Sequence, residues 1–258
     1  MKFDMHCHTK AGSIDSKIPL DQYIELLKAQ GFDGMLVTDH DSYKGYRQWK
    51  ETQKSNPEDH FVVLEGVEYD TKDAGHFIVI MPTGIHLRVL QIRGMDIETL
   101  IQVVHHFGGI LGPAHPFGVK SSSAMFFKKI RKNPRIFYEF DFVEGFNTCE
   151  SIQSNQIAQL MASRYGKPCT GGSDAHVEEY VGMAFTEFDA DIRSNDDMID
   201  AIREHRIVSY GGTVREFTKK AKRKNAFYAV WGFKVYNRSL GFLFTPYRKH
   251  KIKKLAAI

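Results

Sequence analysis

The stretch Phe3-Asp4-Met5-His6-Cys7-His8-Thr9 sets how the whole sequence is interpreted. It predicts a buried strand over residues 2–7 with two histidines at its end, spaced two apart. Side chains in a strand alternate between the two faces, so His6 and His8 point the same way and can reach one ion. The pair therefore indicates a metal site built at the end of a strand.

Six further apolar runs, bounded by glycine, proline or aspartate, predict buried strands. They cover residues 34–39, 61–69, 76–81, 109–114, 142–146 and 169–172. Amphipathic helical patterns lie between most of these runs. Strand–helix alternation of this kind predicts an α/β fold with parallel strands and right-handed crossovers, either closed into a barrel or left as an open sheet.

More histidines and acids fall where these strands give way to loops. They are His40 after the second strand, Glu65 and Glu68 in the third, His115 after the fifth, and Asp174 and His176 after the last. The carboxyl ends of parallel strands share one rim, where α/β barrels gather their chemistry. His76 is the exception, because it begins its strand.

The density of these groups argues for metal binding. A lone histidine is usually a surface or hydrogen-bonded residue. A cluster of buried ionisable groups, however, needs mutual pairing or a cation to offset its desolvation. Imidazole and carboxylate ligands together favour Zn²⁺, Mn²⁺ or Fe²⁺ over Ca²⁺ and Mg²⁺.

Length and composition are those of an ordinary globular protein. The chain has 258 residues, 42% hydrophobic and 26% charged, which is enough for one large domain or one domain with an appendage. Three cysteines are too few for a disulfide framework, which favours the cytoplasm. No signal peptide and no transmembrane segment are expected, because the chain starts with charged residues and histidines and has no long apolar run.

Charge divides the chain into an acidic body and a basic C-terminal extension. Residues 215–258 hold 13 of the 35 lysines and arginines but only one of the 31 acids, Glu216. We expect residues 1–214 to form the metal-binding domain and residues 215–258 to pack on it. Contact of the extension with nucleic acid or an anionic membrane is the less favoured interpretation.

Five motifs resemble those of the PHP superfamily, named after polymerase and histidinol phosphatase. They are Phe3–Thr9, Val37-Thr38-Asp39-His40-Asp41, Gly66-Val67-Glu68, Ala114-His115-Pro116 and Gly172-Ser173-Asp174-Ala175-His176. They occur in the order of that family, and the resemblance spans roughly residues 1–210. It implies a distorted (β/α)7 PHP barrel with a two- or three-metal centre that hydrolyses phosphoesters.

The resemblance also implies nine ligands for two or three divalent ions of manganese, zinc or iron. They are His6, His8 and Asp174 for the first ion, His76 and His115 for the second, Asp15, His40 and His176 for the third, and Glu68 as the bridge. Glu65 competes with Glu68 for the bridging position, but Gly-Val-Glu is the family wording.

The mechanism that follows is in-line attack on phosphorus by a metal-bridging hydroxide. The residues expected to hold this hydroxide are His6, His8, Glu68 and Asp174. Three lysines after the metal motifs, Lys10, Lys44 and Lys120, are weaker candidates for contacting the substrate phosphate. The expected substrate is a phosphorylated metabolite, a nucleotide or a short oligonucleotide.

Two other functions remain open. An amidohydrolase-type C–N hydrolase also begins with His-x-His, although that class commonly bridges its ions with a lysine. A non-enzymatic PHP module, associated with nucleic acid through the basic extension, would need a partner protein.

Overall fold

A computed structural model describes most of the chain. The described residues are 1–52, 60–118 and 123–215, together with seven residues of the basic extension: 231, 232, 235, 236, 239, 243 and 246. The statements below concern these residues.

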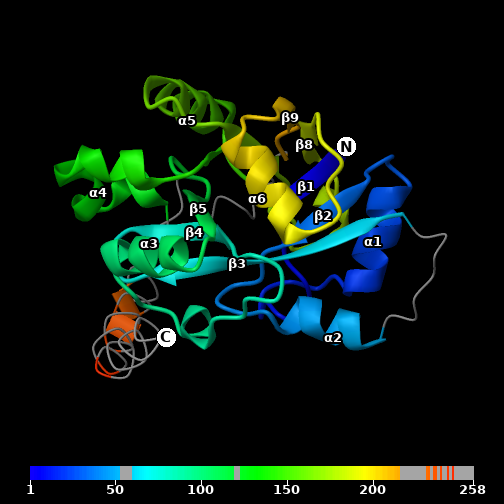
Figure 1. Cartoon of the computed structure of the whole chain (residues 1–258), viewed down its shortest axis with the longest axis horizontal. Coiled ribbons are helices and arrows are strands. Elements are labelled where there is room, and N and C mark those ends of the chain that lie inside the picture. The colour runs from blue at the N-terminus through cyan, green and yellow to red at the C-terminus, as the bar shows by residue number, and fades with distance from the viewer. Residues whose placement is uncertain are drawn as a thin grey trace.

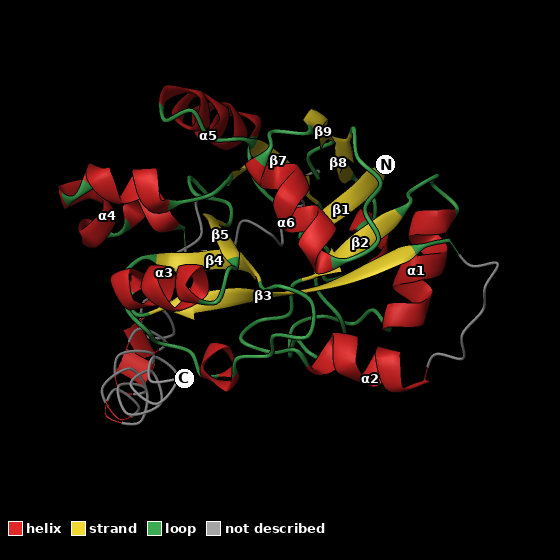
Figure 2. Cartoon of the chain, viewed as in Figure 1, coloured by secondary structure: helices red, strands yellow, loops and turns green. Residues whose placement is uncertain are grey.

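The fold is built on a strongly curled sheet of seven strands in the order β5-β4-β3-β2-β1-β8-β9 (Figure 2). The strands are β1 (Lys2–Cys7), β2 (Gly34–Val37), β3 (Val62–Thr71), β4 (Gly75–Ile80), β5 (Ile110–Pro113), β8 (Ala184–Phe188) and β9 (Ile207–Gly212). β1, β2 and β3 are parallel to one another. β4 runs antiparallel to both β3 and β5, and β8 antiparallel to both β1 and β9.

A separate parallel pair, β6 (Val143–Asn147) and β7 (Cys169–Gly172), lies between the two edges of this sheet. β6 contacts both edge strands, β5 and β9, and β7 contacts β1, β8 and β9. The pair therefore bridges the open side of the curled sheet, and it brings the end of β7 to the end of β1.

Six α-helices lie between the strands (Figure 1). They are α1 (Leu20–Lys28), α2 (Lys44–Thr52), α3 (Ile97–His106), α4 (Lys128–Lys132), α5 (Ile152–Arg164) and α6 (Asn195–Arg203), with short 3-10 turns at Arg88–Gln91, Ala124–Phe126, Pro134–Glu139 and Glu178–Tyr180. Side chains cap three of them: Asp96 accepts from Thr99 N, Ser151 from Ser154 N, and Ser194 from Asp197 N.

The α/β class is confirmed, and all seven expected strands exist. The expectation of uniformly parallel strands is wrong, because β3 turns directly into β4 through residues 72–74 with no crossover helix. β8 and β9 were not expected from the sequence. Three clusters of buried apolar residues pack α3, α6 and α1 against the strands.

Little of the basic extension is described. Trp231 and Tyr236 are 61% and 53% exposed. Tyr236 nevertheless lies against the body, with the guanidinium carbon of Arg93 6.0 Å from its ring centre. Among the described residues, no helix is long and apolar enough to cross a membrane.

Candidate metal centre

The structure brings all nine predicted ligands together at one end of the curled sheet. Isolated backbone bridges hold the strand ends side by side, one joining Cys7 to Ala175 and the other joining His40 to Glu68. These two bridges lie within or beside the His-x-His, Asp-His-Asp, Gly-Val-Glu and Asp-Ala-His motifs. The meeting of the motifs is therefore a direct result of strand pairing.

Glu68 lies at the centre of the cluster and is completely buried. Its Oε1 is 2.9 Å from His76 Nδ1 and 2.9 Å from His115 Nε2. Its Oε2 faces three more imidazole nitrogens, at 2.9 Å from His40, 3.3 Å from His8 and 3.5 Å from His6. The two oxygens thus face different groups of histidines, as a bridging carboxylate requires.

Asp174 and Asp15 complete the cluster. Asp174 Oδ1 is 3.3 Å from His8 Nε2 and 3.5 Å from His176 Nδ1. Asp15 Oδ2 is 3.3 Å from His176 Nε2 and 3.6 Å from His40 Nε2. The Asp15 side chain is 52% exposed, whereas that of Asp174 is 3% exposed, so the cluster opens towards solvent at Asp15.

The antiparallel direction of β4 explains the position of His76. In the β3–β4 hairpin His76 pairs with Asp70, near the end of β3. The beginning of a reversed strand lies at the same rim as the ends of the parallel strands. His76 therefore reaches the cluster because it starts its strand.

Strand alternation separates the two candidate bridging carboxylates. Glu65 and Glu68 are three residues apart on β3, so their side chains leave opposite faces. Glu65 turns away from the cluster, and its Oε2 is 2.8 Å from His86 Nδ1. The geometry therefore matches the choice of Glu68.

The electrostatics of the cluster require positive charge around the carboxylates. Burial raises the pKa of Glu68, but His76, His40 and His6 outweigh it and hold this pKa well below its usual value. Burial lowers the pKa of His6, but Glu144, Glu68 and Asp174 outweigh it and raise this pKa well above normal. Either protons on the histidines or bound cations must supply that charge.

Unpaired buried atoms favour cations. Glu68 Oε2, His40 Nδ1 and His76 Nε2 are buried and make no hydrogen bond with any described residue. The 2.9 Å approach of His40 Nδ1 to Glu68 Oε2 is an ionic contact whose angles do not suit a hydrogen bond. Buried imidazole and carboxylate atoms that lack a hydrogen-bond partner in this way fit divalent ions.

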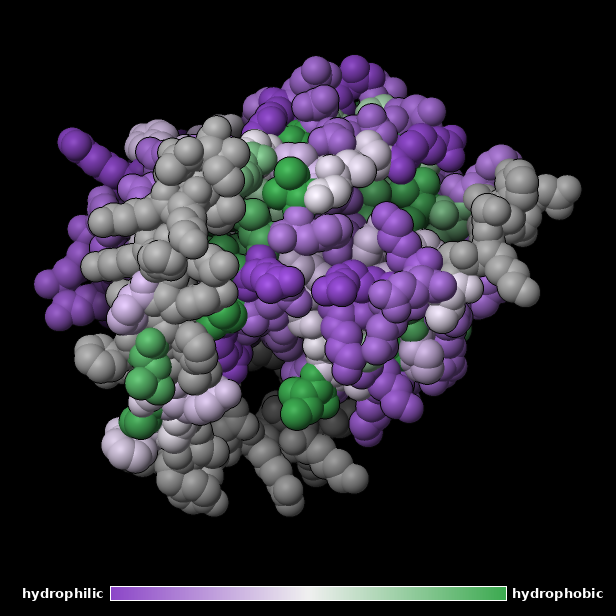
Figure 3. All heavy atoms as spheres, turned by 60° about the horizontal axis from the view of Figure 1, so that its bottom comes forward, coloured by the Kyte–Doolittle hydropathy of each residue, from purple (hydrophilic) through white to green (hydrophobic). Residues whose placement is uncertain are grey.

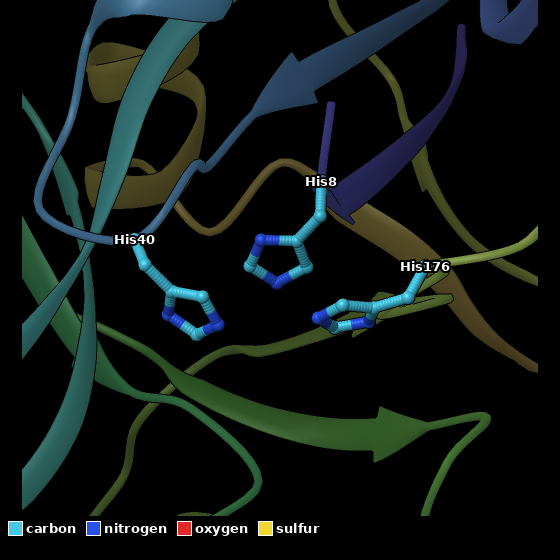
Figure 4. Close-up of side chains that lie close together, drawn as sticks. All are labelled: His8, His40 and His176. Carbon is cyan, nitrogen blue, oxygen red and sulfur yellow. The ribbon is translucent and has the colours of Figure 1, made fainter. Parts of the chain in front are cut away.

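Three overlapping groups of donor atoms are close enough to hold ions, each group with its atoms within 4.8 Å of one another. They are His6, His8 and Glu68; His40, Glu68 and His76; and His8, His40 and His176. Figure 4 shows the rings of the third group turned towards a common space. Glu68 is shared by the first two groups, and the three groups together contain six of the nine residues.

Three residues with unusual backbone angles lie in or beside the cluster. Asp41, His115 and Asp174 have positive φ angles of 47°, 31° and 51°. Such angles are uncommon outside glycine and cluster at functional sites, where the surrounding structure holds them. Two of these three residues belong to the predicted ligand set, and the third follows His40.

Sequence reasoning missed the residues that contact the ligands from behind. Glu144 Oε1 is 2.8 Å from His6 Nδ1, and Asn147 Nδ2 donates to Asp174 Oδ2 at 3.3 Å. Ser13 Oγ is 3.1 Å from His8 Nδ1 and donates to Asp39 Oδ1 at 2.8 Å. A charged residue inside the short apolar run 142–146 was the available signal for Glu144.

The three lysines proposed for substrate contact lie outside the cluster or outside the described residues. Lys10 and Lys44 are exposed, the first just after the His-x-His motif and the second at the start of α2. Lys120 lies in the segment 119–122, which is not described.

Comparison with known proteins gives one family match. Residues 153–207, from α5 to the start of β9, match the model of a family described as PHP-associated. No curated protein matches the sequence.

Solved structures share the fold at low sequence identity. A candidate metal-dependent phosphoesterase from Bifidobacterium adolescentis is 15% identical with a TM-score of 0.57, over 77% of this chain and 94% of its own. Endonuclease Q with an abasic duplex substrate is 17% identical with a TM-score of 0.61, over 90% of this chain and 66% of its own. An amidohydrolase from Chromobacterium violaceum, whose structure holds sulfate and no metal, is 16% identical with a TM-score of 0.56, over 80% and 97%.

Identities this low establish the fold and leave the activity open. The region that matches the family, residues 153–207, contains the Asp-Ala-His motif of the cluster. Together, the PHP-associated region and the shared fold confirm the resemblance of this chain to the PHP superfamily.

Proposed function

We propose that this protein is a metal-dependent phosphoesterase, a hydrolase of phosphoric ester bonds with two or three divalent ions of manganese, zinc or iron. The observation that carries the proposal is the position of Glu68, buried between imidazoles on both of its oxygens. In a two-metal site, Glu68 would be the residue shared by both ions, which together would bind one phosphate.

Bound ions would supply Lewis acidity, which activates water as the nucleophile and stabilises charge on the phosphoryl oxygens. His6, His8 and Asp174 hold the buried side of the site, and their outer atoms are fixed by neighbouring protein groups. Fixed ligands lose little freedom when the ions bind, and this pre-organises the site for charge that develops in the reaction.

The substrate approaches from the side of Asp15. This carboxylate and the imidazoles of His40 and His176 are 52%, 22% and 24% exposed, whereas His6 and His8 are fully buried. Lys10 is exposed and lies between the His-x-His motif and Asp15 in the sequence. A phosphate ester that reaches the cluster therefore meets the third donor group first.

The substrate class is a phosphorylated metabolite, a nucleotide or a short oligonucleotide. Mono- and diesters are separated by assaying p-nitrophenyl phosphate and bis-p-nitrophenyl phosphate with Mn²⁺, followed by nucleotides and short DNA and RNA. No turnover of any phosphate ester by metal-loaded protein would overturn the proposal.

The amidohydrolase alternative is tested in the same assay with an amide substrate. The bridging position of that class is commonly a lysine, and here Glu68 occupies the place between the donor groups. Amide turnover that exceeds phosphoester turnover in the same metal-loaded sample would favour C–N hydrolysis.

Removal of metal should abolish activity and lower stability. A ligand at 100 times its Kd stabilises the folded state by about 2.7 kcal/mol, which for a chain of this size is roughly 5–11 °C in Tm. We expect a chelator to stop hydrolysis and lower Tm by an amount of this order, and Mn²⁺ to restore both. Elemental analysis that finds no zinc, manganese or iron after metal-replete purification would contradict the prediction.

We also propose that the basic extension packs on the body, with Tyr236 against Arg93 as its described contact. Arg93 donates to Asp70 at 2.7 Å, and Asp70 in turn lies near His76, so this contact is close to the metal cluster. The face in Figure 3 is mainly hydrophilic, with its apolar side chains in separate small patches.

Deleting residues 216–258 should therefore lower Tm more than it lowers affinity for nucleic acid. Tm falls because the truncated body lacks the apolar and charge contacts of the extension. Each kcal/mol of lost stability lowers Tm by about 2–4 °C. Thermal melts of the full and truncated proteins, with binding to RNA and to anionic vesicles at physiological salt, check this. A truncated protein that melts like the full chain but loses RNA or vesicle binding would reverse the assignment.

A further inference from the structure

The side chain of Glu144 occupies a second, deeper position behind the metal cluster. It leaves β6 and is 1% exposed. Its Oε1 is 2.8 Å from His6 Nδ1. Its Oε2 accepts from the backbone N–H of His115 at 2.5 Å and from Asn147 Nδ2 at 3.1 Å. Both oxygens are therefore used by protein donors on the far side of the ligands.

These contacts argue against Glu144 as a tenth ligand. A carboxylate that binds an ion turns an oxygen towards it, whereas both oxygens of Glu144 lie against protein donors. None of the described donor groups close enough to hold an ion includes Glu144. The residue acts on the ligands rather than on the ions.

The contact with His6 determines which ring nitrogen faces the ions. When Glu144 Oε1 accepts a hydrogen bond from Nδ1, the proton of neutral His6 lies on Nδ1, and Nε2 keeps a free lone pair. His6 Nε2 is the atom that lies near His8, Glu68 and Asp174. Glu144 thus sets the tautomer in which His6 can bind a metal.

The contact with His115 acts through the backbone. His115 has a φ of 31°, a conformation that L-residues seldom adopt. The hydrogen bond from its N–H to Glu144 Oε2 opposes relaxation of this strain. It therefore helps to keep His115 Nε2 at 2.9 Å from Glu68 Oε1.

Close packing at Gly172 permits this arrangement. A Cβ added at Gly172 would lie 2.3 Å from the Cβ of His6 and 3.0 Å from Glu144 Oε1. Only a residue without a side chain lets β7 pass so close to both residues. The local sequence therefore builds a space for the carboxylate directly behind the imidazole.

We propose that Glu144 is a positioning residue that sets the tautomer of His6 and the backbone of His115, and so couples two ligands that belong to different ions. The proposal rests on the metal centre proposed above. It extends that function to a residue behind the ligands that orients two of them.

Replacing Glu144 with glutamine changes the hydrogen-bonding capacity of the side chain and keeps its shape. Glutamine has nearly the same volume, but one of its two terminal atoms is a donor. Whichever way the amide turns, its NH₂ meets a protein donor, either His6 Nδ1–H or the pair His115 N–H and Asn147 Nδ2. His6 then shifts its proton to Nε2, or the backbone of His115 moves.

We expect Glu144→Gln to weaken Mn²⁺ or Zn²⁺ binding about 10–100-fold, the usual loss for an outer partner of a metal ligand. Affinity is measured in the full chain by competition with a chelating dye, and stoichiometry by elemental analysis. The metal-free variant should melt close to metal-free wild type. Glu65→Gln is the matched control, because Glu65 is buried, pairs with His86 and lies outside the cluster.

Three further comparisons exclude a merely structural role. Glu144→Asp keeps an acceptor-only carboxylate that is one methylene shorter, so metal affinity should fall in the order wild type, aspartate, glutamine. On a His6→Ala background, Glu144→Gln should cost much less than it does alone, because its partner is gone. Cobalt-loaded protein should also show a changed visible absorption band in Glu144→Gln and not in Glu65→Gln.

The outcomes separate the two proposals. Wild-type protein that binds no divalent metal would overturn the metal centre and this inference together. Wild-type binding with unchanged affinity in Glu144→Gln would overturn the inference alone. Tighter metal binding by Glu144→Gln than by Glu144→Asp would likewise show that Glu144 only fills space. So would an equal loss of metal affinity from Glu144→Gln with and without the His6 side chain.

Discussion

Glu68→Gln should lower kcat/KM for a phosphate ester by more than the roughly 10–100-fold typical of an outer metal partner, and should reduce the number of bound ions per chain. Both oxygens of Glu68 face imidazole groups at 2.9 Å, so an amide NH₂ must point at one of these groups. An amide also lacks the negative charge that would balance two cations bound to the same side chain. Metal analysis and steady-state kinetics on the same preparation measure both effects.

Glu65→Gln is the control for this prediction. Glu65 lies on the opposite face of the same strand, and its contact is with His86. Burial raises its pKa to about 7, with Lys50 and Arg47 opposing this, so loss of its charge should be tolerated. Should Glu65→Gln lose metal while Glu68→Gln keeps it, the bridge has been assigned to the wrong carboxylate.

Much of the candidate site was predictable because its ligands lie at strand ends that could be read from local patterns. His-x-His after β1 and Asp-x-His after β7 need only the alternation of side chains in a strand. The choice between Glu65 and Glu68 also follows from alternation, once one of them is known to face the cluster. The direction of β4 was missed, although the six residues between the expected strands 61–69 and 76–81 are too few for a parallel crossover.

Non-local contacts account for the rest of what was missed. Glu144 is 138 residues from His6 in sequence, and only the position of the β6–β7 pair brings them together. β8 alternates buried and half-buried side chains over Ala184–Phe188, a pattern too short to distinguish from a loop. Local patterns thus located the ligands, whereas their supporting contacts depend on how distant strands meet.

Asp174→Asn should remove most activity while preserving the fold, and it is a sharper test than truncation to alanine. The φ of Asp174 is 51°, and asparagine is among the few residues that tolerate this conformation. The substitution therefore keeps the backbone and the side-chain size, and it removes the negative charge near His8, His6 and His176. We expect a loss of kcat/KM beyond about 100-fold, with circular dichroism unchanged.

Asp41→Asn is a matched control for this last prediction. Asp41 also has a positive φ, of 47°, but it is not one of the nine predicted ligands, and its side chain lies against Arg93 and the backbone N–H of Asp70. Its substitution should cost no more than about 10–100-fold, the range for an outer partner. Full turnover by metal-loaded Asp174→Asn would show that this carboxylate is no ligand. A larger loss in Asp41→Asn than in Asp174→Asn would move the ligand to the Asp-His-Asp motif.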